Sequence, residues 1–473
     1  MFLRIDTLQP LTEEWARKAS KEGGWSSNSI AITEYWFKQG LRPFSLTRDL
    51  KWGIPVPLKE MKDKVLYVWF DAPIGYPSIT ANYTDDWEQW WKNPEQVSLY
   101  QFMGKDNVRF HTVIFPSCLI GTKEPWTKLQ QISTTEYLQY EGGKFSKSRN
   151  IGVFGDKAGE IGVAPSVWRY YLISNRPESS DSQFSWSEFI ARNNGELLNN
   201  LGNFVNRVLT FVSKKYESNL PQQDDRPLEG RFKSFVDDIN KLLGTYAENM
   251  EAAKLRVGLS TMMAISARGN LFLVEIGLDN KLFNDKRGEC DVAVSVAVNL
   301  IYLLAALVHP FMPSTADEIL VQLDAPAPAL PAAGEWTAKA LLPGHKIGKP
   351  KHLFRRIEDN MEEVWRRQFG GSDADEAAPP PISKSKAAKL AKQARKEAAA
   401  SAGAQPGSST SASSSTPLAA EPTQTPEIIE LQKKIDEQGQ AVREAKAASK
   451  APAATDEAKS KAEAEVQTLL KLK

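Results

Sequence analysis

Two apolar runs in the first part of the chain have the pattern of buried β-strands. Residues 65–70 read Val-Leu-Tyr-Val-Trp-Phe, which is β-rich and nearly all apolar, as in a strand buried on both faces. Proline and glycine within residues 71–77 predict its end. A second strand is predicted over residues 97–103 and is followed by Gly104 and polar side chains. In open α/β sheets ligands bind beyond the carboxyl ends of the strands, so the residues after both runs are candidate site residues.

The next part of the chain shows the apolar spacing of helices. Apolar residues recur every three or four positions from Leu197 to Phe211. Further helices are predicted over about 229–248, 251–276 and 290–308, and a shorter charged helix over 353–369. The long helices predict an antiparallel helix bundle.

The C-terminal part divides into a low-complexity segment and a last helical pair. Residues 370–426 are mainly Ala, Ser, Pro and Lys, cannot bury a core, and predict a disordered linker with a basic run. Apolar positions return over residues 427–473 on both sides of Pro452, which predicts a helical hairpin. The predicted domains are therefore 1–178, 179–345, 346–426 and 427–473.

The composition argues against several classes of functional site. The 59 basic and 58 acidic residues give a net charge of +1, so any nucleic-acid signal must be local. Two cysteines and four histidines, none of the latter spaced as a pair on one helix face, predict no metal site and fit a reducing compartment such as the cytoplasm. No signal peptide is evident, and no uninterrupted apolar run reaches membrane-spanning length, so no membrane partner is predicted.

The strongest chemical pattern is Glu-Gly-Gly-Lys-Phe-Ser-Lys-Ser-Arg-Asn at residues 141–150. The two glycines allow backbone angles that suit a mobile loop. Lys144, Lys147 and Arg149 then supply three cations, and Ser146 and Ser148 supply hydroxyl donors. Such a loop can close over a polyphosphate and neutralise its charge. An exposed basic turn without chemistry is the alternative for this segment alone.

Residues at the ends of the predicted strands add to this pattern. Trp69, Pro73 and Tyr76 are candidate pocket walls after the first strand, and Asp106 after the second could accept hydrogen bonds from ribose hydroxyls. His111 could point into the same crevice. Ordinary core packing is the alternative for the aromatic residues, and a satisfied core histidine is the alternative for His111.

Three segments taken together resemble a known family. They are Tyr-Val-Trp-Phe-Asp-Ala-Pro-Ile-Gly-Tyr at 67–76, Gly-Lys-Asp at 104–106 with His111, and Lys-Phe-Ser-Lys-Ser at 144–148. In this order they resemble the methionyl-tRNA synthetases (methionine–tRNA ligases) of the eukaryotic cytosolic type, in which the last motif reads Lys-Met-Ser-Lys-Ser. The resemblance implies an α/β fold: the C-terminal half of a class I, Rossmann-like catalytic domain, followed by an all-α anticodon-binding bundle.

The resemblance also implies substrates and residue roles. It implies methionine, ATP with Mg²⁺, and tRNA(Met) as partners. The residues that match the methionine pocket are Trp69, Ala72, Pro73, Tyr76 and His111. Gly104 and Asp106 match ribose-binding positions, and Ser146 and Ser148 lie in the ATP-binding signature. Lys144 and Lys147 match lysines that stabilise the transition state of adenylation, and Arg48 matches an arginine that closes the site.

Further resemblance concerns tRNA. Asn203 and Arg207 match residues that read the anticodon, with a solvated mid-helix pair as the alternative; Asp279 stands where the family's stacking tryptophan is expected. The C-terminal hairpin resembles the WHEP appendix of several eukaryotic synthetases, which binds tRNA weakly. Its candidate contacts are Lys433, Lys434, Arg443 and Lys446. Packing against another protein, as in a multi-synthetase complex, is the other interpretation of this hairpin.

Some family features have no counterpart. The His-x-Gly-His motif that binds ATP phosphates, the acidic residue that meets the amino group of the substrate and the zinc-binding insert are not found in the sequence. We therefore expect the chain to lack the N-terminal part of the catalytic domain and to expose a strand edge. Two functions stay open: a methionine–tRNA ligase, or a non-catalytic tRNA-binding or scaffolding product of the same family.

Overall fold

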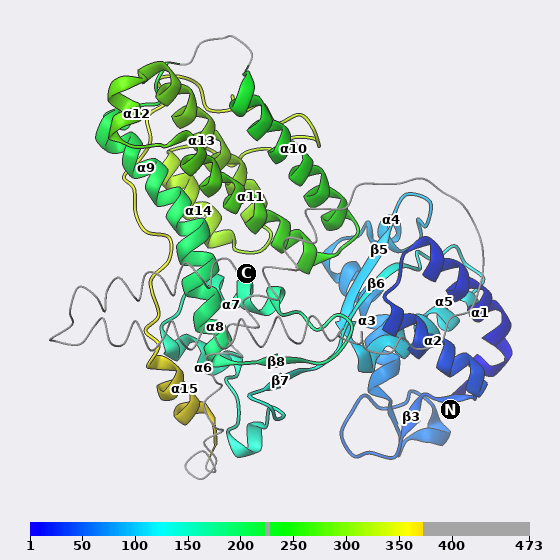
Figure 1. The fold of residues 1–473 in the computed structure, drawn as a ribbon. Helices are drawn as coiled ribbons and strands as arrows, with labels where there is room; N and C mark the ends of the chain where they lie inside the picture. Colours follow the sequence, from blue (N-terminus) through cyan, green and yellow to red (C-terminus); the bar gives the residue numbers. More distant parts are fainter. Residues whose placement is uncertain (223–227, 372–473) are drawn as a thin grey trace, which may run out of the picture. The chain divides into compact units, whose positions relative to one another are not determined.

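The computed structural model describes residues 1–222 and 228–371 (Figure 1). The linker and hairpin predicted beyond residue 371 lie outside this part of the chain. The described residues hold an N-terminal α/β part, a pair of parallel strands with flanking helices, and a helix bundle.

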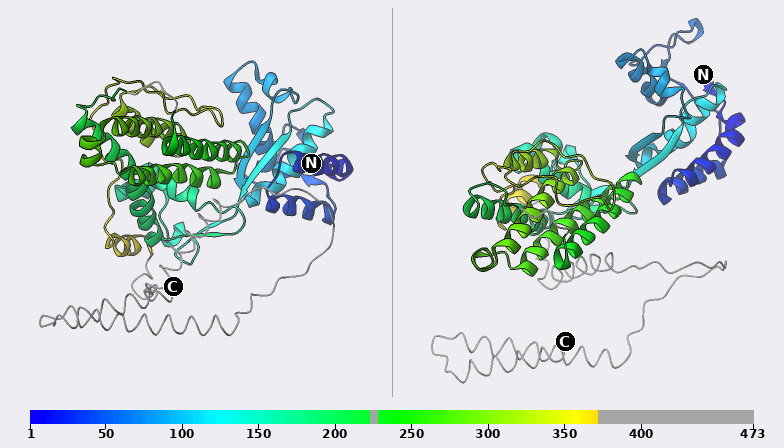
Figure 2. Two further views of the ribbon diagram at one scale, coloured as in Figure 1. Left: turned by 45° about the horizontal axis from the view of Figure 1, so that its top comes forward. Right: turned by 90° about the horizontal axis from the view of Figure 1, so that it is seen from above.

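The α/β part is built on a parallel pair of strands, β5 (Leu99–Gly104) and β6 (Leu129–Thr135). Helices α1 (Ile5–Glu22) and α2 (Ser27–Gln39) lie along one side of these strands (Figure 2). Apolar residues from the two helices and the turn between them, from β6 and from the segment after β5 form one buried cluster: Ala16, Trp25, Phe37, Val108, Val113, Leu129 and Ile132. Two short antiparallel pairs complete the part, β1 (Phe2–Leu3) with β2 (Phe44–Ser45) and β3 (Thr47–Arg48) with β4 (Val65–Leu66).

The other face of β5 is open. Among the described residues β5 pairs only with β6, so its second edge has no strand partner. Tyr100 and Phe102, two positions apart and therefore on the same face of β5, are 42% and 53% exposed. Parallel strands normally have both faces covered, so this apolar face is unusual for an α/β protein.

The prediction of a buried strand over residues 65–70 is wrong beyond Leu66. The chain turns at Tyr67 and forms α3 (Val68–Tyr83). A short apolar run fits a buried helix segment as well as a strand, and periodicity alone does not separate them. Pro73 and Pro77, which were predicted to mark the end of a strand, instead lie buried within α3, four positions apart. Short helices α4 (Trp87–Trp91) and α5 (Phe115–Gly121) pack beside α3 through Trp91 and Phe115.

A second parallel pair is formed by β7 (Leu138–Tyr140) and β8 (Ser182–Phe184). The loop of residues 141–152 follows β7 directly in the sequence. Helices α6 (Gly155–Ala158) and α7 (Pro165–Ser174) lie between these strands in sequence. Trp186, at the start of α8 (Trp186–Arg192), is fully buried behind β8.

The predicted helix bundle is confirmed. Helix α8 continues through a π-helical stretch, Asn193–Gly202, into α9 (Asn203–Lys215). The remaining helices are α10 (Gly230–Glu251), α11 (Leu255–Ile276), α12 (Asn280–Asp285), α13 (Arg287–Val308) and α14 (Pro313–Leu323). Their apolar faces share one large core, which also takes in Tyr140, Trp186 and Phe369.

Helices α11 and α13 are long and apolar enough by composition to cross a membrane. Their most apolar 18-residue windows are, however, 56% and 83% buried inside the protein. Core helices of a bundle have this composition because they are apolar on nearly all sides. We interpret both as core helices.

Only part of the charged helix predicted over residues 353–369 forms. Helix α15 is Met361–Phe369, and residues 353–360 are irregular. The side-chain amide of Asn193 donates to the carbonyl of Arg355 (2.9 Å), and that of Asn194 bonds both the carbonyl and the N–H of Ile357 (2.8 and 3.0 Å). These bonds satisfy backbone groups that a longer helix would use, so the irregular conformation is favoured.

Gly269 provides a test of the bundle core. A Cβ at this position of α11 would lie 2.7 Å from the ring of Phe204 and 2.9 Å from Leu300. Gly269→Ala is therefore expected to lower the free energy of unfolding by about 1–3 kcal/mol, because the helices must separate. Gly288→Ala is the control, since nothing lies within 4 Å of that Cβ. Equal urea midpoints for the two variants would contradict this packing.

Candidate active site

The hydrogen bond between Tyr76 and His111 defines the first part of the site. His111 is 7% exposed and lies in a π-helical turn, Phe110–Ile114. Its Nδ1 lies 2.8 Å from the carbonyl oxygen of Asn107. A carbonyl only accepts, so Nδ1 carries the proton and the Nε2 of the neutral ring accepts from the Tyr76 hydroxyl at 2.8 Å. This pair joins α3 to the turn that follows β5.

Trp69 lies two helical turns before Tyr76. Its ring stacks on Phe110 with centroids 3.9 Å apart and planes 7° from parallel. Trp69, Tyr76 and His111 are thus brought together by α3 and the 110–114 turn. Of the other two residues implied for a methionine pocket, Pro73 is buried in α3 and Ala72 is exposed.

Burial lowers the pKa of the His111 imidazole below its usual 6.5, and the bond to the Asn107 carbonyl opposes this only in part. As pH falls below 6.5 the unfolded chain takes up the proton before the folded protein does, so His111 makes folding less favourable at acid pH. We expect an NMR titration midpoint below 6.5 for this ring, with the signal assigned by its loss in His111→Gln. A midpoint at or above 6.5 would contradict the burial argument.

Gly104 and Asp106 lie where predicted, at the carboxyl end of β5. The Asp106 carboxylate accepts from the Tyr137 hydroxyl at 2.5 Å. The Lys105 ammonium lies 4.1 Å from the centre of the Tyr137 ring and pairs with Glu136 (2.5 Å) and Asp181 (3.2 Å). Tyr137 thus orients the carboxylate from the end of the neighbouring strand.

Tyr137 is not among the site residues predicted from the sequence. The signal that could have found it is its place just after β6, since the carboxyl ends of neighbouring parallel strands share one edge. Its hydrogen bond to the Asp106 carboxylate raises the pKa of the phenol, so it stays a donor at neutral pH.

Arg48 lies at the end of β3 opposite Val65. Its guanidinium carbon is 3.6 Å from the centre of the Tyr67 ring, a cation–π contact. Tyr67 precedes α3, so Arg48 lies beside the N-terminus of the helix that contains Trp69.

We call residues 141–152 the lysine loop. Ser146 and Ile151 exchange two backbone hydrogen bonds (both 2.9 Å), and Lys147–Arg149 form a 3₁₀ turn that ends at Asn150 with φ of 55°. The Phe145 ring packs against Tyr140, with centroids 5.3 Å apart. These contacts close the loop on itself.

The cations of the lysine loop point into solvent. Lys144, Lys147 and Arg149 are exposed, and none of them makes an ion pair with another residue of the described ranges. Ser148 is also exposed, whereas Ser146 is half-buried and accepts a weak bond from Arg149 (3.3 Å). Charge on this loop is therefore not neutralised by the surrounding described residues.

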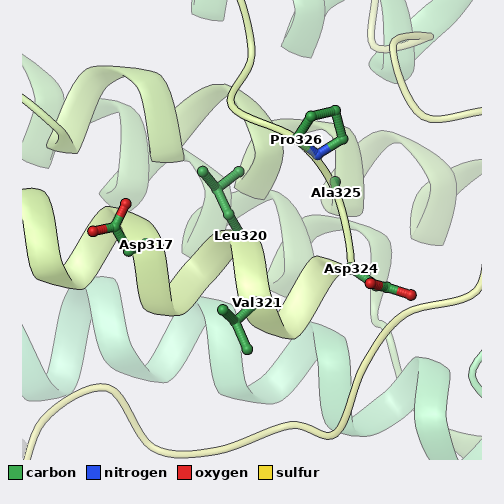
Figure 3. A pocket seen from close by; sticks show the side chains of 6 residues that line it. All are labelled: Asp317, Leu320, Val321, Asp324, Ala325 and Pro326. Carbon is green, nitrogen blue, oxygen red and sulfur yellow. The ribbon is translucent and has the colours of Figure 1, made fainter.

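The methionine-pocket candidates and the lysine loop are not joined by any hydrogen bond or ion pair within residues 1–222 and 228–371. A surface hollow of about 490 Å³ lies elsewhere, at the end of α14 (Figure 3). It is lined by Asp317, Leu320, Val321, Asp324, Ala325 and Pro326, none of which is a candidate site residue. Within the same ranges, no group of three His, Cys, Asp or Glu side chains is placed to hold a metal ion.

The candidate anticodon residues lie on α9. Asn203 and Arg207 are exposed; Asn203 approaches Asn270 (3.4 Å) and Arg207 donates to the Leu278 carbonyl (3.3 Å). Asp279 caps α12, because its carboxylate accepts from the N–H of Leu282 at 2.8 Å. Asp279 thus has a structural role at the place where a stacking tryptophan was expected. Lys433, Lys434, Arg443 and Lys446 lie outside the described residues.

Two family models match the chain. One, described as tRNA synthetases class I (M), matches residues 1–209. The other, described as the anticodon binding domain of methionyl tRNA ligase, matches residues 227–374. The two matches cover the α/β part and the helix bundle.

Curated relatives agree with these matches. The chain is 58% identical to the probable cytoplasmic methionine–tRNA ligase of Schizosaccharomyces pombe, over 79% of this chain and 48% of the relative. It is 53% identical to the cytoplasmic methionine–tRNA ligase of Saccharomyces cerevisiae, over 78% and 49%. The human cytoplasmic enzyme is 43% identical over 81% and 42%. The chain thus spans about half the length of the curated relatives it matches.

A solved structure shares the fold. Methionyl-tRNA synthetase of Mycobacterium tuberculosis in complex with methionyl-adenylate superposes with a TM-score of 0.65 at 21% identity, over 75% of this chain and 68% of that one. Sequence motifs, both family models and the fold therefore agree, and the chain belongs to the methionyl-tRNA synthetase family.

Proposed function

We propose that this chain acts as a methionine–tRNA ligase in the cytoplasm, where its named relatives act. The observation that carries the proposal is the exposed, unneutralised set of Lys144, Lys147 and Arg149 on a loop of the family's signature. Three exposed cations without an ion-pair partner among the described residues favour binding of a polyanion such as ATP.

In the first step a carboxylate oxygen of methionine attacks the α-phosphorus of ATP, and the bond to pyrophosphate breaks. Both reactants are anions, so the protein must align them and neutralise charge. Lys144 and Lys147 would stabilise the charge that develops on the phosphates, with Ser146 and Ser148 as hydroxyl donors. Gly104 and Asp106 would hold the ribose, with Asp106 oriented by Tyr137. Arg48 would close the site.

Methionine would bind against α3. Its unbranched, polarisable thioether packs well on aromatic rings, which Trp69 and Tyr76 supply beside His111. Pro73 and Ala72 would complete the wall. The Asn107 carbonyl holds the proton on Nδ1 of His111, and burial favours the neutral imidazole, so the pocket would present no formal charge to an apolar side chain.

Mg²⁺ would accompany ATP. Mg²⁺ is usually held by substrate phosphates and one or two carboxylates rather than by a full set of protein ligands. Since no group of three His, Cys, Asp or Glu side chains is placed to hold a metal ion among the described residues, the ATP phosphates would supply most of the ligands. We propose no zinc site for the chain.

In the second step a ribose hydroxyl of the terminal adenosine of tRNA(Met) takes methionine from the adenylate and AMP leaves. Asn203 and Arg207, exposed on α9, are proposed to contact the anticodon. The basic hairpin predicted at residues 427–473 is proposed to raise the local tRNA concentration. Membership of a multi-synthetase complex is proposed for the same segment.

The test is methionine-dependent exchange of pyrophosphate into ATP with the purified 473-residue chain. Exchange that requires methionine, and is not supported by leucine, supports the proposal. Absence of exchange at micromolar protein, while the chain still binds tRNA(Met), would overturn it for this polypeptide.

The second candidate is a tRNA-binding product of the family without catalysis. The open face of β5, with Tyr100 and Phe102 exposed, favours it because the sheet that should carry the site is only partly covered. Tight binding of a non-hydrolysable methionyl-adenylate analogue would exclude this candidate, since a tRNA-binding protein has no need of that pocket.

A further inference from the structure

Helix α15 packs against the base of the lysine loop, although it lies more than two hundred residues later in the chain. Trp365 and Phe369 of α15 are 4% and 3% exposed. Their rings lie 5.0 and 5.8 Å from the ring of Trp186. The indole N–H of Trp186 donates to the hydroxyl of Tyr140, the last residue of β7, at 2.7 Å. One buried cluster thus joins α15 to the strand that enters the loop.

The exit of the loop is held by backbone bonds. The N–H of Gly152 donates to the carbonyl of Phe369 at 2.8 Å, and Ile151 forms an antiparallel bridge with Gly370. Gly371 has a φ of 80°, and a Cβ there would lie 2.9 Å from the carbonyl oxygen of Arg149. The chain after α15 therefore lies tightly along the end of the loop.

The entrance of the loop is held by Glu141. One carboxylate oxygen accepts from the N–H of Trp186 (2.8 Å) and the other from the guanidinium of Arg366 (3.0 Å). Glu141 has a φ of 46°, a conformation that costs energy for a residue with a Cβ and persists only where neighbours impose it. Arg366 also pairs with Glu362 within α15 (2.9 Å).

We propose that α15 positions the lysine loop. Arg366 is the positioning residue at the N-terminal end of the loop, and Phe369–Gly370 hold its C-terminal end through backbone hydrogen bonds. Both ends of the loop are fixed, while Lys144 and Lys147 between them stay exposed. A loop that is fixed at both ends and anchored through Phe145 keeps its exposed lysines free to bind an anion and limits the positions at which they can bind it. The catalytic consequence rests on the proposed function; the positioning itself does not.

The first test measures the loop directly, by hydrogen–deuterium exchange of the full chain. Arg366→Met keeps the bulk of the side chain and removes the ion pair; Arg367→Met is the matched control, because Arg367 is 77% exposed and makes only a 3.8 Å pair with Glu363. We expect peptides covering residues 141–152 to exchange about tenfold faster in Arg366→Met alone, as expected for loss of a charged hydrogen bond.

Two outcomes would overturn the positioning. One is unchanged exchange of residues 141–152 in Arg366→Met. The other is faster exchange spread evenly over β5, β6 and the bundle, which would mean that Arg366 serves global stability. Arg366→Lys, which retains a charge near Glu141, is expected to restore part of the protection.

The second test uses pyrophosphate exchange. Arg366→Met is expected to lower kcat about tenfold with an unchanged KM for methionine, because the candidate methionine-pocket residues share no hydrogen bond or ion pair with α15 among the described residues. A raised KM for methionine with unchanged kcat would contradict positioning of the loop. If the unaltered chain gives no exchange at all, the proposed function fails, while the deuterium result still decides the positioning.

Discussion

Lys147→Ala is expected to lower methionine-dependent pyrophosphate exchange by about 10²- to 10³-fold, the usual effect of removing one group that stabilises transition-state charge. Lys147 begins the 3₁₀ turn of the lysine loop, is exposed and has no anionic partner among the described residues. Its ammonium is thus not occupied in holding the fold together. The loss should fall on kcat, because charge on the phosphates increases as the bond to pyrophosphate breaks.

The control for this experiment is Lys157→Ala. Lys157 follows the loop by a few residues, is also exposed, and pairs with Glu160 at 2.8 Å. Since an exposed pair of this kind contributes little to stability, activity and melting temperature should stay near those of the parent chain. Equal losses in the two variants would mean that general positive charge, and not Lys147, supports the reaction.

Trp186→Ala is expected to lower the free energy of unfolding by about 3–5 kcal/mol. The side chain is fully buried, with its ring 4.8 Å from Phe184, 5.8 Å from Phe189 and 5.0 Å from Trp365. Its removal opens a cavity where β8, α8 and α15 meet. It also leaves the buried Tyr140 hydroxyl without its 2.7 Å donor.

Urea denaturation of the full chain measures this effect. Trp52→Ala serves as the control, because Trp52 is 91% exposed and its loss should change the midpoint little. Trp186→Phe should fall between the two, since it keeps most of the packing and loses the indole N–H. A midpoint for Trp186→Ala that matches the Trp52 control would contradict a shared core of α8 and α15.

The parts of the fold with a long periodic pattern could be predicted from the sequence. Helices α10, α11 and α13 were expected within a few residues of their observed bounds, because an apolar stripe sustained over 22 residues is typical of a packed helix. Strand β5 was likewise predicted within two residues. The class I α/β fold followed by a bundle came from the family resemblance and is confirmed by both family models.

Short segments could not be assigned, because their conformation is set by distant partners. Residues 68–70 read as a strand, yet they form the first turn of α3, where Trp69 stacks on Phe110. Residues 353–360 read as helix, yet amides of Asn193 and Asn194 hold them irregular. In both cases the deciding contact lies about 40 or more positions away, outside any local pattern.

For the candidate site too, some residues could be predicted from the sequence and others could not. Residue types and spacing singled out Lys144, Lys147, Asp106 and His111 as chemistry-bearing groups. The groups that orient them were not visible: Tyr137 holds Asp106, and Arg366 holds Glu141 at the loop entrance. Such partners are ordinary residue types in unremarkable surroundings, and only the folded chain brings them together.

The contact between Glu141 and Arg366 also bears on biosynthesis, because the two residues are 225 positions apart. Domains fold from the N-terminus as the chain emerges from the ribosome, and contacts between distant positions form late. The β5–β6 pair can close as soon as residue 135 is free. The lysine loop, however, gains its anchors only after residue 370 has been synthesised. A nascent chain therefore carries an unfinished candidate site until the whole bundle has been translated.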